Sequence, residues 1–133
     1  MLGRGYVIIT LSSIISRNWI KRWSMLKHQF GIMMTDPASE QIFEEYEPEK
    51  YDCIAVDDEY VQAVAEKLAG VSVYWHGLDR PESGLAYHGI TLIPPESITE
   101  VIEAVRDVPE MRRLKKMLVV AERERKFVIH FGV

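Results

Sequence analysis

The sequence is poor in several features that would assign it to a functional class. It has a single cysteine, Cys53, so it has no internal disulfide that would indicate an oxidising compartment. Its eight glycines are scattered rather than grouped in a phosphate-binding loop. It also lacks a G-x-S-x-G nucleophile motif, an H-E-x-x-H helix and paired C-x-x-C motifs. These absences predict a cytoplasmic protein without a cofactor or a metal site, and they weigh against an enzyme.

Long hydrophobic runs are absent as well. The longest apolar run, Tyr6–Ile15, is too short to span a membrane, because a spanning helix needs about 20 apolar residues. Arg4 precedes this run as in a signal peptide, but no cleavage site with small residues follows it. The sequence therefore predicts neither a spanning helix nor a standard signal peptide.

Acidic residues are missing from the first quarter of the chain and abundant afterwards. Residues 1–34 carry five Lys or Arg and no acid, a net charge of +5. Residues 35–133 carry 11 basic and 20 acidic residues, a net charge of −9, and the two sum to the −4 of the chain. This change predicts a basic N-terminal segment over residues 1–34 and a single acidic domain over residues 35–133.

The N-terminal segment has three interpretations. Apolar residues recur at three- and four-residue spacing from Ile15 to Phe30, which is typical of an amphipathic helix. Such a helix either packs on the domain or binds an anionic membrane surface. Its membrane-binding residues would be Trp19, Trp23, Arg17 and Lys21. Alternatively, the segment is not part of the natural product, and translation starts at Met33 or Met34, where the composition changes.

The acidic domain combines strand and helix patterns. Strands are expected at Tyr51–Val56, Val71–His76, Leu85–Ile93 and Lys126–Val133. One helix is expected after the first strand and two before the last, because their apolar residues recur at helical spacing. The β-α-β-β-α-α-β order predicts a small α+β domain with a mixed or antiparallel sheet, and it is compatible with a ferredoxin-like arrangement.

An aromatic-His-Gly triplet occurs twice, at residues 75–77 and 87–89. If the flanking strands form a hairpin, the two histidines lie near each other at its base, with carboxylates in its loop. Histidine with carboxylate is a ligand set for divalent metals and also serves acid–base catalysis. The candidate residues are His76, His88, Asp79 and Glu82. We favour the alternative, a structural hairpin whose imidazole nitrogens bond to backbone or water.

Three other groups of residues have structural explanations. Cys53 lies mid-strand, where a buried thiol is more common than a nucleophile. Residues 57–59 are all acidic and suit the N-cap and first turn of a helix. The last helix is basic, but Glu residues interleave with its cations. That pattern predicts a solvated face with local ion pairs and weighs against nucleic acid as a partner.

The acidic composition is the main indication of function. We expect a small acidic soluble protein that binds another protein, such as an inhibitor, an immunity protein or an antitoxin, because acidic surfaces attract basic partners. The candidate partner-binding residues are Glu40, Glu44, Glu45, Glu47 and Glu49. One alternative is a small metal-dependent or acid–base enzyme that uses the His76 and His88 hairpin. Another is a peripheral membrane protein that binds through its basic N-terminal segment.

Overall fold

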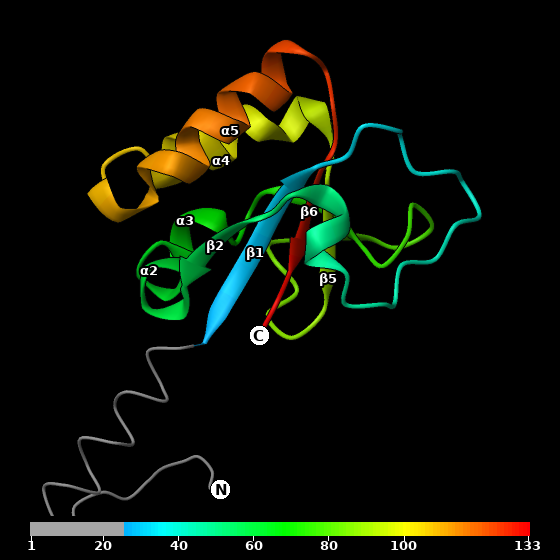
Figure 1. Ribbon diagram of the computed structural model, residues 1–133, viewed down its shortest axis with the longest axis horizontal. Helices are drawn as coiled ribbons and strands as arrows, with labels where there is room; N and C mark the ends of the chain where they lie inside the picture. Colours follow the sequence, from blue (N-terminus) through cyan, green and yellow to red (C-terminus); the bar gives the residue numbers. More distant parts are fainter. Residues whose placement is uncertain (1–25) are drawn as a thin grey trace, which may run out of the picture.

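The computed structural model describes residues 26–133, which form a mixed α+β fold around an open six-stranded sheet (Figure 1). The strands are β1 (Lys27–Ile32), β2 (Ile54–Asp57), β3 (Ser72–Trp75), β4 (Pro81–Ser83), β5 (Ile90–Ile93) and β6 (Val128–Phe131). The helices are α2 (Asp58–Ala63), α3 (Ala65–Leu68), α4 (Ile98–Val105) and α5 (Arg112–Arg123). Short 3-10 turns occur at η1 (Pro48–Tyr51), η2 (Pro95–Ser97) and η3 (Pro109–Met111). The predicted α+β class is confirmed.

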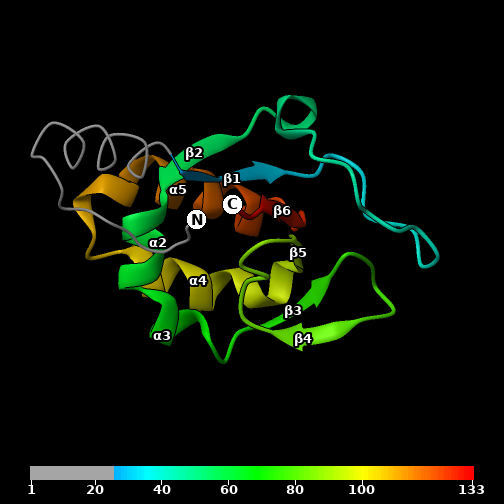
Figure 2. The ribbon, with the colours of Figure 1, turned by 90° about the horizontal axis from the view of Figure 1, so that it is seen from below.

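All neighbouring strands are antiparallel, in the order β2-β1-β6-β5-β3-β4. Strands β2 and β4 form the two edges of the sheet, as Figure 2 shows. In a split βαβ unit, one strand would separate β2 from β3. Here β1, β6 and β5 all lie between them. The ferredoxin-like variant that the element order permitted is therefore not adopted.

Strand β1 corrects the prediction for the N-terminal segment. Lys27–Ile32 is extended, so the helix predicted over Ile15–Phe30 is wrong at its C-terminal end. β1 pairs with β2 on one side and with β6 on the other, and Gln29 lies opposite a residue of each. The sheet thus begins before the expected boundary at residue 35. A chain that started at Met33 or Met34 would lack a central strand.

One face of the sheet is covered by helices. Leu114 and Leu118 of α5 and Val101 of α4 are buried, together with Phe30 and Val128 of the sheet. The apolar spacing that predicted these two helices therefore marks the sides that they bury. Each such side chain contributes about 1.5–3 kcal/mol when it is fully buried.

The opposite face is covered by a loop. We call residues 33–53, which join β1 to β2, the acidic loop; η1 is its only regular element. Met33 and Phe43 of this loop are buried with Leu92 of β5 and Ile129 of β6. The loop also passes close to Gly31, where a Cβ atom would lie 2.7 Å from a backbone oxygen of the loop. A glycine in β1 thus allows the loop to lie against the sheet.

Candidate functional site

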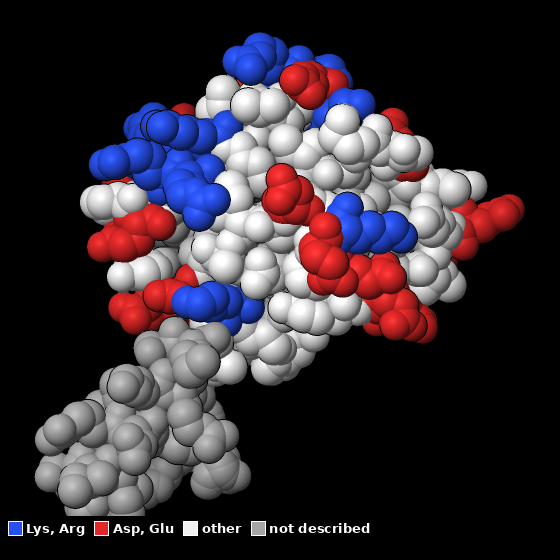
Figure 3. All heavy atoms as spheres, in the orientation of Figure 1, with Lys and Arg blue, Asp and Glu red and all other residues white. Residues whose placement is uncertain are grey.

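Charged side chains are segregated on the surface. The acidic loop carries a single cation, Lys50. Its seven carboxylates belong to Asp36, Glu40, Glu44, Glu45, Glu47, Glu49 and Asp52. On the face drawn in Figure 3, acidic side chains gather over this loop, whereas Lys and Arg gather over α5. The surface therefore offers one strongly acidic and one strongly basic region.

The structure brings the five predicted partner-binding glutamates together on the acidic loop. Four of them are exposed, and Glu47 is half-buried, with its carboxylate 3.6 Å from the Lys50 ammonium. Four exposed carboxylates on one loop repel each other, and a cationic partner would relieve that repulsion.

The acidic loop also exposes large apolar side chains. Met34 is 71% exposed, Ile42 is 61% exposed and Tyr46 is 62% exposed. Only two other large hydrophobic residues in the described part of the chain are exposed, Tyr87 and Val119, and each is 37% exposed. Apolar groups surrounded by charge are typical of protein-binding surfaces, in which an apolar centre is enclosed by a polar rim.

His76 holds the acidic loop in place. The backbone N–H of Phe43 donates to the carbonyl of His76 at 2.7 Å, and Nδ1 of His76 donates to the carbonyl of Phe43 at 2.8 Å. The backbone of His76 is left-handed, with a φ of 66°, a strained conformation for a residue other than glycine. The ring of Tyr46 packs edge-on against Phe131 at a centroid distance of 5.6 Å. The loop is therefore presented in a defined conformation.

The predicted histidine hairpin is formed in part. Strand β3 pairs with β5 as expected, and residues from the connecting segment form β4 on its other edge. Nδ1 of His88 bonds to the main-chain oxygen of Val133 at 3.0 Å, so both hairpin histidines bond to main-chain oxygens. Asp79 and Glu82 are exposed. Within residues 26–133, no group of three or more metal-ligating side chains converges.

A groove of about 730 Å³ lies between the acidic loop and α5. Met34 from the loop and Met117 from α5 line it, and Arg113 lies at its helical side. Cys53 also faces this groove and is half-buried rather than fully buried. Burial, together with Asp52 and Glu49, raises the pKa of the Cys53 thiol to about 12. The thiol therefore remains protonated at neutral pH, which makes it a poor nucleophile.

A chain of polar side chains runs through the core beneath α2. Nε2 of His28 lies 2.8 Å from Oδ1 of Asp58, and Nδ1 of His28 lies 2.8 Å from Nε2 of His130. Nδ1 of His130 lies 3.1 Å from the hydroxyl of Thr91. Both histidines and Thr91 are fully buried, and Asp58 is 2% exposed. We call these four residues the buried polar chain.

The hydrogen bonds of this chain run in one direction. The Asp58 carboxylate can only accept, so Nε2–H of His28 donates to it. In a neutral imidazole the other nitrogen accepts, so Nδ1 of His28 accepts from Nε2–H of His130. Nδ1 of His130 then accepts from the Thr91 hydroxyl, whose oxygen accepts from the N–H of Ala86. This assignment gives each of these groups a partner.

Tyr87 and Gln62 close the chain at its outer end. The hydroxyl of Tyr87 donates to Oδ2 of Asp58 at 2.8 Å, and the amide of Gln62 donates to the same oxygen at 2.6 Å. Burial by itself would raise the pKa of Asp58, but the hydrogen bonds from His28, Tyr87 and Gln62 outweigh it and lower that pKa. Asp58 is therefore ionised at neutral pH, as the direction of the chain requires.

Burial sets the protonation of the two histidines. It lowers the pKa of His28, although the hydrogen bond to Asp58 acts in the opposite direction. Burial lowers the pKa of His130 well below its usual 6.5, and neighbouring His28 lowers it further. Both imidazoles are thus neutral at pH 7. The buried polar chain therefore carries one negative charge, which belongs to Asp58.

Sequence reasoning missed the buried polar chain. Residues 57–59 form the N-cap and first turn of α2 as predicted, but the Asp57 side chain pairs with Lys27 instead of making a capping hydrogen bond. Asp58 points into the core. One signal was present, because His130 lies within the apolar strand Val128–Phe131, where a polar side chain needs a buried partner. Its partner lies 102 positions away at His28, beyond the reach of local patterns.

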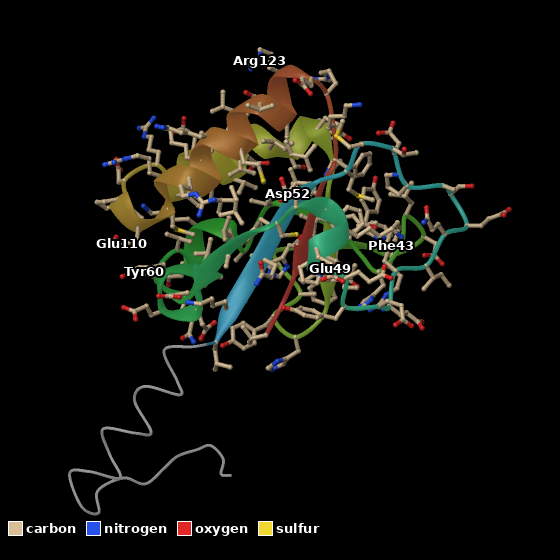
Figure 4. All side chains as sticks on the ribbon, in the orientation of Figure 1. Phe43, Glu49, Asp52, Tyr60, Glu110 and Arg123 are labelled. Carbon is tan, nitrogen blue, oxygen red and sulfur yellow. The ribbon has the colours of Figure 1, made fainter. Side chains whose placement is uncertain are left out.

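Helix α5 also departs from expectation. The predicted local ion pairs are absent: no carboxylate of residues 26–133 lies within 4.0 Å of a cation of this helix. Figure 4 labels Glu110, in the turn η3 just before α5, Arg123 at the end of α5, and Phe43 in the acidic loop on the other side of the view. The two charged regions therefore do not neutralise each other within the domain.

Comparison with known proteins gives no family. No protein family model matches the chain, and no curated protein or solved structure is similar to it. None of the described helices is long and apolar enough to cross a bilayer. The predicted membrane-surface residues Trp19, Trp23, Arg17 and Lys21 lie outside the described residues.

Proposed function

We propose that this protein binds another protein through its acidic loop, and that the partner presents a basic surface. The observation that carries this proposal is the coincidence of exposed apolar side chains and carboxylates on one ordered loop. Ile42 and Tyr46 would supply apolar contact area at the centre of the interface. The surrounding glutamates would attract the partner and select for positive charge.

The length and order of the loop support this proposal. Connections of more than about 12–15 residues without regular structure are uncommon in compact domains and are often functional. The acidic loop spans residues 33–53, with the short turn η1 as its regular structure. It is fixed by two hydrogen bonds between Phe43 and His76, one between backbone groups and one from the His76 ring. A loop that is already ordered loses little conformational entropy on binding, which favours affinity. An inhibitor, an immunity protein or an antitoxin would use such a surface.

Site-specific photocross-linking in cells of the natural source tests this proposal. A photoreactive aromatic amino acid would replace Tyr46, which is exposed and aromatic already. The matched control would carry the same amino acid at Glu66, which is exposed on α3. We expect a specific adduct with a protein that presents a basic surface from position 46 and none from position 66.

Affinity measurements with the purified partner would complete the test. Glu44→Gln with Glu45→Gln should slow association by about tenfold and weaken its dependence on salt. Glu66→Gln with Glu100→Gln, which also neutralises two exposed carboxylates, should leave association unchanged. A partner that is cross-linked only from position 66, or that binds the Glu44→Gln/Glu45→Gln variant as fast as the native chain, would refute the proposal.

A further inference from the structure

The basic face of α5 offers the kind of surface that the acidic loop would bind. Arg112, Lys116, Val119 and Arg123 are exposed and follow one another at four-, three- and four-residue spacing. They therefore lie along one face of a helix about 18 Å long. Val119 places an exposed apolar group between the cations.

The two surfaces match in both charge and apolar character. Four of the five exposed large hydrophobic residues of the described chain lie on them, three on the acidic loop and Val119 on α5. The loop carries carboxylates next to its apolar residues in the sequence. On α5 three cations lie one turn from Val119, namely Lys115, Lys116 and Arg123, and the remaining neighbour Glu122 accepts a hydrogen bond from Thr99. Unpaired charge of opposite sign next to apolar groups is the complementarity expected of two surfaces that bind each other.

We propose that α5 of a second copy of this chain docks on the acidic loop, so that copies associate head to tail. This inference rests on the proposed function, since it uses the same loop and names the partner. The contact is heterologous, because it joins the acidic loop of one copy to α5 of the next, and these are different surfaces. One free loop and one free helix remain at the ends of any open assembly, so association should continue with rising concentration.

Other classes of binding partner fit the exposed face of α5 less well. An anionic membrane would need apolar side chains that can insert, but Leu114, Leu118 and Ala121 face the core, and the outer face exposes only Val119 among large apolar residues. A nucleic acid would meet the cations of α5, yet the carboxylates of the remaining surface would repel its phosphates. The acidic loop, by contrast, meets both the charge and the apolar centre of α5.

Sedimentation of two complementary variants of the full chain tests the proposal. The loop variant carries Ile42→Ser, Glu44→Gln and Glu45→Gln, all at exposed positions. The helix variant carries Arg112→Gln, Lys116→Gln and Val119→Ser, also at exposed positions. At about 50 mM NaCl the native chain should form assemblies that grow with concentration, and at about 500 mM NaCl these should dissociate.

Each variant alone should sediment as a monomer. A mixture should form a one-to-one complex of twice the chain mass and no larger species, because only the native loop of one variant can bind the native α5 of the other. Lys67→Gln with Arg80→Gln removes two exposed cations outside α5 and should leave assembly intact.

Several results would overturn the inference. These are a native chain that stays monomeric at low salt, variants that assemble like the native chain, or a mixture that does not form the complex. Monomers that bind a 20-nucleotide DNA through α5 would show that the face recognises phosphate instead. A monomeric native chain that still cross-links a different protein from position 46 would refute self-association alone and leave the proposed function standing.

Discussion

The buried polar chain and the acidic loop both depart from the usual distribution of side chains, in which polar groups face solvent and apolar groups face the core. The first places Asp58, His28, His130 and Thr91 in the core, where every one of them has a hydrogen-bond partner. The second places Met34, Ile42 and Tyr46 in solvent. Each kind of exception is tolerated in a different place. Buried polar groups need partners inside the fold, whereas exposed apolar groups need a partner outside it.

The largest effect is expected when the strand that carries His28 is removed. A chain without residues 1–32 lacks β1, which pairs with both β2 and β6. It should show no cooperative unfolding transition in urea, as followed by circular dichroism. A chain without residues 1–24 keeps β1 and should unfold cooperatively. Cooperative unfolding of the shorter chain would show that β1 is dispensable.

Asp58→Ala should produce the next largest effect. It removes the acceptor of hydrogen bonds from His28, Tyr87 and Gln62 and leaves a buried imidazole N–H without a partner. The free energy of unfolding should fall by about 3–5 kcal/mol in urea titrations. Asp57→Ala breaks only a partly exposed ion pair with Lys27 and should cost less than about 1 kcal/mol. Equal losses of unfolding free energy in the two variants would contradict the stabilising role assigned to the buried polar chain.

Through the buried polar chain, acid should destabilise the fold at a higher pH than that at which ordinary carboxylates are protonated. The pKa values of His28 and His130 are lowered in the folded state, so the unfolded chain binds protons first as the pH falls through about 6.5. Stability is therefore complete above that pH and decreases below it, by up to about 2.7 kcal/mol per pH unit for two protons. The lowered pKa of Asp58 adds a further loss below about pH 3.9.

Urea titrations between pH 5 and 8 would measure this slope. His130→Leu removes the histidine whose pKa is lowered further and should therefore reduce the slope by at least half in the same range. An unchanged slope in this variant would show that other groups determine the pH dependence.

The smallest effect on stability is expected in the acidic loop. Ile42→Ser exchanges an exposed side chain and should change the free energy of unfolding by less than about 0.5 kcal/mol. Phe43→Ala, at the adjacent buried position, should cost about 3–5 kcal/mol. A large loss in Ile42→Ser would indicate that this side chain serves the fold rather than a partner.

The sequence predicted those parts of the fold that follow local patterns. Helix α5 and strand β6 appear where their apolar residues predicted them. Helix α5 buries one side against the sheet, whereas β6 buries Val128 on the helix-covered face and Ile129 on the loop-covered face. Strand β1 was missed, since Phe30 and its neighbours also fit helical spacing and the competing strand pairing is non-local. The clustering of the five glutamates followed from the sequence, because they are neighbours in the chain. The contact between His28 and His130 did not, because it joins distant strands.

The position of β1 in the sheet has a consequence for synthesis. Gln29 pairs with Phe131, so the first strand of the described domain must wait for the last before the centre of the sheet can close. At roughly 5–20 residues per second, a ribosome needs about 5–20 s to make the intervening segment. During that interval β1 can pair only with β2 and exposes its other edge. A nascent chain of this protein therefore carries an open strand edge for seconds, which makes chaperone binding most useful before β6 emerges.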